Sequence, residues 1–253
     1  MDAGLSAIAV TDHDTVSAFA EAKSAGRALG VEVVPGIEIS TKYKGATHIL
    51  GYYIDPESDN LKPVLEWVVK DRDDRNEKIA ELMRSDGLPV YYDEMKERFG
   101  EIVGRPHFAE LLVEFGLARD IGEAFDKYVD KGKKYWLPRQ FLSLERAVEI
   151  VGESGGVAVL AHPFQYKLDD TELRELLKLC IDHGLKGIEC RYSGYTPEQT
   201  GYLESLAAEF NLFRTGGSDF HGERKKNIAI GSGTGTLCVP YEYLEELRCA
   251  AGR

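Results

Sequence analysis

The sequence predicts a barrel-like α/β fold interrupted by a helical insertion. Short apolar runs of β type alternate with stretches whose apolar residues recur at helical spacing, which is typical of parallel βα units. Several of these runs end on His, Asp or Glu, and the carboxyl ends of strands carry the chemistry in such folds. A purely helical pattern breaks the alternation in the middle of the chain. We therefore expect a barrel domain made of residues 1–55 and 139–253, and a helical subdomain made of residues 56–138.

The first elements place three acidic residues and two histidines at or beside strand ends. A strand over residues 7–10 stops on Asp12-His13-Asp14, and a helix capped by Thr15 should follow to Leu29. Two strands over residues 31–35 and 36–40 put Glu38 where a buried strand turns outward. A further strand over residues 48–54 begins on His48.

The insertion is predicted to contain helices over residues 61–82, 91–99, 106–115 and 121–128. Arg105 and His107 stand at the start of the third of these helices, where Pro106 suits the first turn. A basic tract, residues 131–134, includes Lys133. Such a tract is usually a solvated loop, and the functional alternative is that it binds a phosphate group.

Strand and helix alternate again in the last part of the chain. We expect helices over residues 143–154, 170–183 and 196–210 and a last one from Tyr241. The strands between them, residues 157–161, 187–190 and 212–216, lead to His162 and to Asp219 with His221. His183 is predicted to end a helix and is excluded from the site.

Composition excludes several classes of protein. The 253 residues are 43% hydrophobic and 29% charged, as in an ordinary globular protein, and the net charge of -12 argues against a broad basic face for nucleic acid. The four cysteines show no C-x-x-C spacing, so a thiolate site or a disulfide framework is not indicated. Without a signal peptide or an apolar run of membrane-spanning length, we expect a cytoplasmic protein.

The histidines favour a metal centre. A lone histidine at a strand end is more often a hydrogen-bonded residue than a ligand, but four of the six histidines, His13, His48, His162 and His221, sit at or beside such ends. Imidazole and carboxylate ligands without thiolate suit Mn, Fe or Zn. A carboxylate such as Glu38 can bridge two ions. Adjacent divalent ions that share a hydroxide are suited to attack on a phosphoester.

Five motifs, in the same order, resemble those of the PHP (polymerase and histidinol phosphatase) family. They are Thr11-Asp12-His13-Asp14-Thr15, Pro35-Gly36-Ile37-Glu38-Ile39-Ser40, His48-Ile49-Leu50-Gly51, Ala161-His162-Pro163 and Gly217-Ser218-Asp219-Phe220-His221. The helical insertion is similar to that of the bacterial branch that hydrolyses nucleoside 3′,5′-bisphosphates and degrades 5′-phosphorylated RNA from its 5′ end.

The resemblance implies a distorted seven-stranded, TIM-like (βα) barrel with two or three divalent ions, most often Mn, with Fe, Zn or Mg as alternatives. It implies that Glu38 bridges, with His48 and His162 on one metal, Asp219 on a second, and His13 with His221 on a third. It implies that Asp12 does not bind a metal itself but orients the imidazole of a histidine that does. Arg105, Lys133 and His107 would hold a phosphate of the substrate, a phosphorylated nucleotide or a short RNA 5′ end.

The chain departs from the family at its beginning. The family opens on a strand with His-x-His and, shortly after, a metal-binding Asp, and the sequence has no His-x-His. The simplest interpretation is that the first βα unit is missing, through a misplaced start codon or an incomplete gene. We then expect unpaired strand edges, poor solubility or partner-dependent folding, and only the position of Glu38, His48 and His162 close to complete.

Two alternatives to the nucleotide phosphoesterase stay open. One is a small-metabolite phosphatase of the histidinol phosphate type, although the helical insertion argues against it. The other is an inactive PHP domain that binds a metal or a nucleotide.

Overall fold

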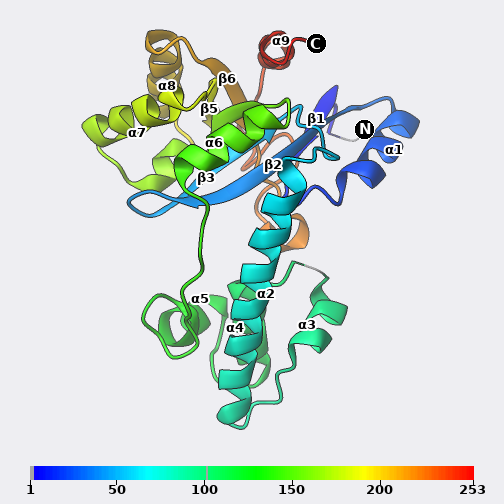
Figure 1. The fold of residues 1–253 in the computed structure, drawn as a ribbon, viewed down its shortest axis with the longest axis vertical. Helices are drawn as coiled ribbons and strands as arrows, with labels where there is room; N and C mark the ends of the chain where they lie inside the picture. The colour runs from blue at the N-terminus through cyan, green and yellow to red at the C-terminus, as the bar shows by residue number, and fades with distance from the viewer. Residues whose placement is uncertain (1–2, 101) are drawn as a thin grey trace. The chain divides into compact units, whose positions relative to one another are not determined.

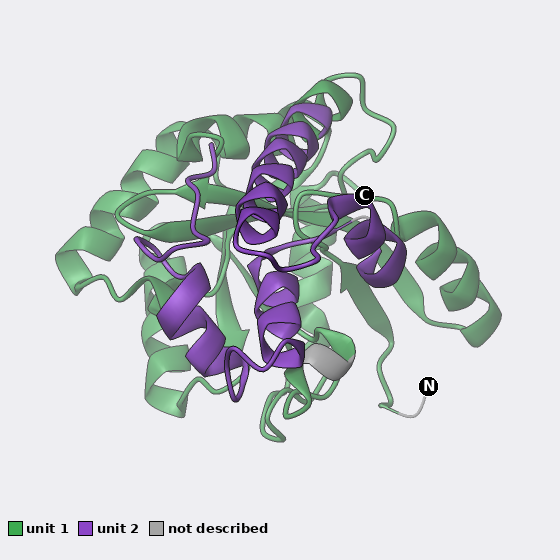
Figure 2. Cartoon of the chain, turned by 90° about the horizontal axis from the view of Figure 1, so that it is seen from below, with its two compact units in different colours: residues 1–65, 141–253 green, residues 66–140 purple. Residues whose placement is uncertain are grey.

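The computed structural model describes residues 3–100 and 102–253. They divide into two compact units, residues 1–65 with 141–253 and residues 66–140 (Figure 2). The predicted helical subdomain, residues 56–138, and the second unit differ at both ends. Residues 56–65 belong to the first unit because Leu61, which begins helix α2 (Leu61–Ser85), is fully buried in that unit's core.

The first unit is built on one open, six-stranded sheet that forms a half-barrel (Figure 1). Its strands follow one another across the sheet in chain order: β1 (Ala7–Val10), β2 (Glu32–Lys42), β3 (Ala46–Tyr52), β4 (Val157–Leu160), β5 (Gly187–Tyr192) and β6 (Phe213–Gly217). The pairs β1–β2, β4–β5 and β5–β6 are parallel, and β3 runs antiparallel to both β2 and β4.

The expectation of parallel βα units is therefore wrong at β3, which makes the sheet mixed. Only residues 43–45 connect β2 to β3, and so short a link can join antiparallel strands only, since a parallel neighbour requires a crossover of a dozen residues or more. The stretches predicted as two strands over residues 31–40 form the single strand β2. His48 lies inside β3, opposite Ser40, and does not begin that strand.

Helices pack against one face of this sheet. They are α6 (Leu144–Glu153), α7 (Asp170–Asp182) and α8 (Pro197–Glu209), and the unit also contains α1 (Phe19–Leu29), α9 (Tyr241–Ala250) and the 3₁₀ turns η2 (Pro163–Tyr166) and η3 (Gly222–Lys225). Ile37 and Ile39 face the main apolar core formed with α6, α7 and α8. Because successive side chains of a strand point to opposite faces, Glu38 between them lies on the other face of the sheet.

The predicted cap of α1 is also corrected. The helix begins at Phe19, with Ala18 and not Thr15 at the N-cap position. Thr15 accepts a hydrogen bond from the main-chain N–H of Ser17 (3.3 Å), so its hydroxyl stabilises the turn that precedes the helix.

The second unit is helical. It contains most of α2, followed by α3 (Tyr92–Phe99), α4 (Arg105–Glu114), the single turn α5 (Ile121–Ala124) and the π-helical turn η1 (Phe125–Val129). Its core is apolar and includes Ile79, Met83, Phe108 and Leu112, each at most 1% exposed. Within the described part of the chain, no helix is both long and apolar enough to cross a membrane.

Candidate metal centre

Glu38 is the centre of a cluster of imidazoles in the first unit. It stands in the middle of β2 and is only 6% exposed. Its main-chain N–H donates to the carbonyl oxygen of Asp12 (3.1 Å), and its own carbonyl accepts from the N–H of Asp14 (2.9 Å). These two hydrogen bonds hold the turn after β1 against β2, and they place His13 beside Glu38 as an isolated parallel bridge.

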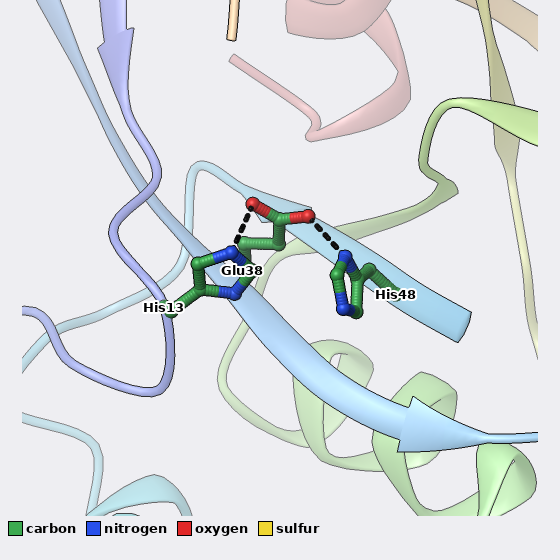
Figure 3. A group of neighbouring side chains, drawn as sticks. All are labelled: His13, Glu38 and His48. Atoms are coloured by element: carbon green, nitrogen blue, oxygen red, sulfur yellow. Dashed lines mark ion pairs between the residues drawn. The ribbon is translucent and has the colours of Figure 1, made fainter. Parts of the chain in front are cut away.

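Three histidines from three segments surround this carboxylate. His48 Nδ1 lies 2.7 Å and His162 Nε2 lies 3.0 Å from Glu38 Oε1. His13 Nε2 is 3.5 Å from the other oxygen, Oε2. Figure 3 shows His13 and His48 on either side of Glu38. The ligand atoms of His13, Glu38 and His48 all lie within 4.8 Å of one another, as a shared metal ion would require.

The spacing fits a divalent ion. His48 Nδ1 and His162 Nε2 are 3.0 Å apart, and both approach the same carboxylate oxygen. Ligands bound at about 2.1 Å from one ion lie about 3.0–3.4 Å apart along the edges of its coordination polyhedron. Two imidazole nitrogens and a carboxylate oxygen suit a transition metal or zinc better than calcium. Glu38, His48 and His162 therefore have both the geometry and the chemistry of a ligand set.

The electrostatics agree with an ionised Glu38. Burial by itself would raise the pKa of this carboxyl, but hydrogen bonds from His162 and His48 and the nearby His13 lower it far below its ordinary value. Burial also lowers the pKa of His13, which favours the neutral imidazole. The pKa of His162 is raised although burial opposes the shift, because His162 hydrogen-bonds to Glu38 and lies near the carboxylates of Glu189 and Asp219. This imidazole would therefore release a proton on binding a metal ion.

His162 is held in an unusual backbone conformation. It directly follows Ala161 after β4 and has a φ of 25°, a region that residues with a side chain seldom adopt. Its main-chain N–H donates to Glu189 Oε2 (2.7 Å). Burial raises the pKa of Glu189 to about 8, and the neighbouring carboxylates Glu38 and Asp219 add to the shift. Glu189 thus positions a predicted ligand and is itself buried beside the cluster.

Asp219 and His221 follow β6 and lie near the same cluster. Asp219 Oδ2 accepts hydrogen bonds from the Tyr192 hydroxyl and from Lys225 Nζ, both at 2.6 Å. His221 Nδ1 is 2.8 Å from the carbonyl oxygen of Asp219, and its ring lies 6.3 Å from that of His13. The structure therefore brings together His13, Glu38, His48, His162, Asp219 and His221, whose assignment to individual metals stays a prediction.

Asp12, expected to orient an imidazole, has an exposed side chain. The buried acid of this turn is Asp14, which accepts hydrogen bonds from the N–H (2.9 Å) and the hydroxyl (3.0 Å) of Ser40. Sequence reasoning missed Asp14, Glu189, Tyr192 and Lys225. A glutamate inside the apolar run Gly187-Ile188-Glu189-Cys190 was a signal that could have identified Glu189.

The three residues predicted to hold phosphate all belong to the second unit. Arg105 is the first residue of α4, 3.7 Å from Asp130, and its guanidinium lies over the ring of Phe125. Lys133 is exposed in the loop after η1. His107 is only 4% exposed, and its Nδ1 accepts the N–H of Gly104 (2.8 Å), which caps α4. The role of these residues in binding phosphate stays a prediction.

An open α/β half-barrel with a His/Glu cluster on its strands defines a candidate metal-dependent hydrolase, and comparisons identify the family. No family model matches the chain. The chain is 32% identical to a 5′-3′ exoribonuclease of Haemophilus influenzae over 219 residues, which cover 86% of this chain and 80% of that protein. It is 34% identical to the 5′-3′ exoribonuclease Rnm of Escherichia coli, over 85% of this chain and 74% of that protein.

Further relatives agree with this assignment. A 3′,5′-nucleoside bisphosphate phosphatase of Chromobacterium violaceum is 29% identical over 92% of this chain and 84% of its own length. The crystal structure of a Bifidobacterium adolescentis protein assigned as a metal-dependent phosphoesterase superposes with a TM-score of 0.83 at 30% identity, over 98% of this chain and 87% of that one. The chain belongs to the PHP family of metal-dependent phosphoesterases.

Proposed function

We propose that the protein is a metal-dependent phosphoesterase that releases phosphate from nucleoside 3′,5′-bisphosphates or from 5′-phosphorylated oligoribonucleotides. The observation that carries the proposal is the approach of two imidazole nitrogens to one buried carboxylate oxygen, at 2.7 and 3.0 Å. The relatives named as exoribonuclease and as bisphosphate phosphatase support nucleotides as the class of substrate.

The residues of the cluster have separate tasks in this proposal. Glu38, His48 and His162 would hold one divalent ion, and His13, Asp219 and His221 would contribute to one or two more. Two or three ions, with manganese as the expected metal, would supply a nucleophile at neutral pH and neutralise phosphate charge. Glu189 keeps His162 in place by accepting a hydrogen bond from the main-chain N–H of His162. Tyr192 and Lys225 both donate a hydrogen bond to Oδ2 of Asp219, which would hold that carboxylate in position.

Release of inorganic phosphate tests the proposal. The substrates are adenosine 3′,5′-bisphosphate and a 5′-phosphorylated RNA oligomer with manganese present, and histidinol phosphate serves as the small-metabolite comparison. Faster release from either nucleotide supports the proposal. Faster release from histidinol phosphate contradicts the choice of substrate, and release from none of them by a manganese-loaded chain indicates a binding module.

A further inference from the structure

A tyrosine hydroxyl joins the end of β4 to β3. The two strands are antiparallel with Ile49 opposite Leu160, so the next pair outward is His48 opposite Ala161. One bond of that pair is direct, from the N–H of Ala161 to the carbonyl oxygen of His48 (3.2 Å). The N–H of His48 instead donates to the hydroxyl oxygen of Tyr166 (3.1 Å), which lies 2.5 Å from the carbonyl oxygen of Ala161. The hydroxyl of Tyr166 therefore bridges a bond that paired strands otherwise make directly.

The direction of these hydrogen bonds follows from the hydrogens available. A tyrosine hydroxyl has one hydrogen to donate, and its oxygen can accept another. Two carbonyl oxygens are within reach, that of Ala161 at 2.5 Å and that of His48 at 3.2 Å. The carbonyl oxygen of His48 already accepts the N–H of Ala161, so the hydroxyl donates to Ala161 at the shorter distance. The hydroxyl thus accepts from His48 and donates to Ala161.

Both residues that this hydroxyl contacts determine where an imidazole of the cluster lies. His48 is itself a predicted ligand, and the carbonyl of Ala161 belongs to the same peptide group as the N–H of His162. That N–H donates to Glu189 (2.7 Å), so two side chains hold the oxygen and the nitrogen of one peptide group. His162 has a φ of 25°, and its Nε2 lies 3.0 Å from Nδ1 of His48. The hydroxyl therefore connects the backbones of the two imidazoles that approach Glu38.

The ring of Tyr166 is fixed independently of its hydroxyl. Tyr166 is the last residue of η2, a turn in which the N–H of Gln165 donates to the carbonyl oxygen of His162 (3.0 Å). Its ring packs against the main apolar core and meets the ring of His162 edge to face, with the centroids 5.6 Å apart. Because packing holds the ring, removal of the oxygen alone should leave the ring in place.

We propose that Tyr166 is a positioning residue of the metal centre, whose hydroxyl sets the distance between the imidazoles of His48 and His162. Without the hydroxyl, the N–H of His48 and the carbonyl oxygen of Ala161 would both lose a partner. They can bond to each other only if the two strands close up, which moves Ala161 and the peptide group of His162 toward His48. The proposal rests on the proposed function only for the use of the bound ion, which is hydrolysis.

Tyr166→Phe in the full chain tests the proposal, because it removes one oxygen and keeps the ring. We expect manganese, titrated by calorimetry into protein stripped with EDTA, to bind about 10–100-fold more weakly, as is usual when a residue that supports a metal ligand is lost.

Tyr195→Phe is the matched control. The hydroxyl of Tyr195 accepts from the N–H of Phe164 (3.1 Å) in the same turn η2, and its ring packs against the same core. In the part of the chain that the structure describes, no hydrogen bond joins this hydroxyl to His48 or His162. Tyr195→Phe should therefore bind manganese as tightly as wild type.

Two further measurements separate positioning from a loss of stability. Thermal unfolding in EDTA is recorded first, and the titrations are made at a temperature at which both variants are folded. Cobalt(II) then replaces manganese at saturating concentration, because its visible absorption depends on the arrangement of its ligands. The cobalt spectrum should change in Tyr166→Phe and should stay that of wild type in Tyr195→Phe.

The outcomes separate this proposal from the proposed function. Wild-type manganese affinity and a wild-type cobalt spectrum in Tyr166→Phe would overturn the positioning role, and so would an equal loss of affinity in Tyr195→Phe. A loss confined to Tyr166→Phe supports it. The same selective loss in a chain that releases no phosphate from either nucleotide would support the positioning role and contradict the proposed function alone.

Discussion

A Glu38→Gln variant replaces the central carboxylate by an amide of the same size. Glu38 is 6% exposed, and it is the carboxylate that His48 and His162 contact, at 2.7 and 3.0 Å. The amide keeps one oxygen and the packing, but it removes the negative charge that would offset a divalent ion. The change should therefore act on metal affinity more than on the shape of the site.

The size of the effect follows from the role of the group. Loss of a residue that only supports a metal ligand typically weakens binding about 10–100-fold, and Glu38 would contact the ion itself. We expect manganese to bind at least about 100-fold more weakly, which corresponds to about 2.7 kcal/mol. Release of phosphate should fall in parallel at limiting manganese.

Manganese affinity is measured by calorimetry on protein first stripped with EDTA, with metal content after dialysis as a second measurement. Glu57→Gln is the control, because the Glu57 side chain is 82% exposed and pairs only with Lys62 among the described residues. Wild-type manganese affinity in Glu38→Gln, with the control unchanged, would refute the assignment of Glu38 as a ligand.

The remaining predictions concern titration and thiol access. Burial raises the pKa of Glu189 from 4.5 to about 8, so its contribution to the free energy of unfolding is complete below pH 4.5 and is lost as the pH rises through 8. Thermal scans in EDTA should show wild type losing stability from about pH 5 to about pH 8. The Glu189→Gln variant should lose less stability over the same pH range, and an equal loss would contradict the raised pKa of Glu189. Burial raises the pKa of Cys180 and Cys190 to about 12, whereas Cys238 and Cys249 are exposed. A thiol reagent should label only the exposed pair in the folded protein and all four in denaturant, and rapid labelling of Cys180 in the folded protein would contradict the packing of α7.

The sequence places several of the ligand candidates directly after apolar runs, and the fold brings these candidates together, although their role as ligands stays a prediction. His162 and Asp219 each follow an apolar run, and the parallel strands β4, β5 and β6 bring those ends to one edge of the sheet. Helical spacing located α3 and α4 within one residue at each end. It placed the end of α2 three residues too early, and residues 121–128, predicted as one helix, form α5 and the π-helical turn η1 instead.

Features that depend on tertiary contacts could not be predicted in the same way. Asp12 and Asp14 both flank His13 in the sequence, but in the fold Asp14 has a positive φ of 56° and its carboxylate contacts Ser40, whereas Asp12 is exposed. The antiparallel direction of β3 follows from the short loop between β2 and β3. A strand pattern based on apolar runs alone does not take loop length into account. Arg72, Arg105 and Arg139 are far apart in the sequence, yet in the folded second unit burial and these three charges together lower the pKa of Arg75.

The most direct test of the central claim is a manganese-soaked crystal measured near the manganese absorption edge. We predict an anomalous peak bonded to Glu38 Oε1, His48 Nδ1 and His162 Nε2, at about 2.0–2.3 Å from each. Manganese found elsewhere on the chain, with these three side chains hydrogen-bonded to one another and not to the metal, would contradict the claim that they form a metal centre.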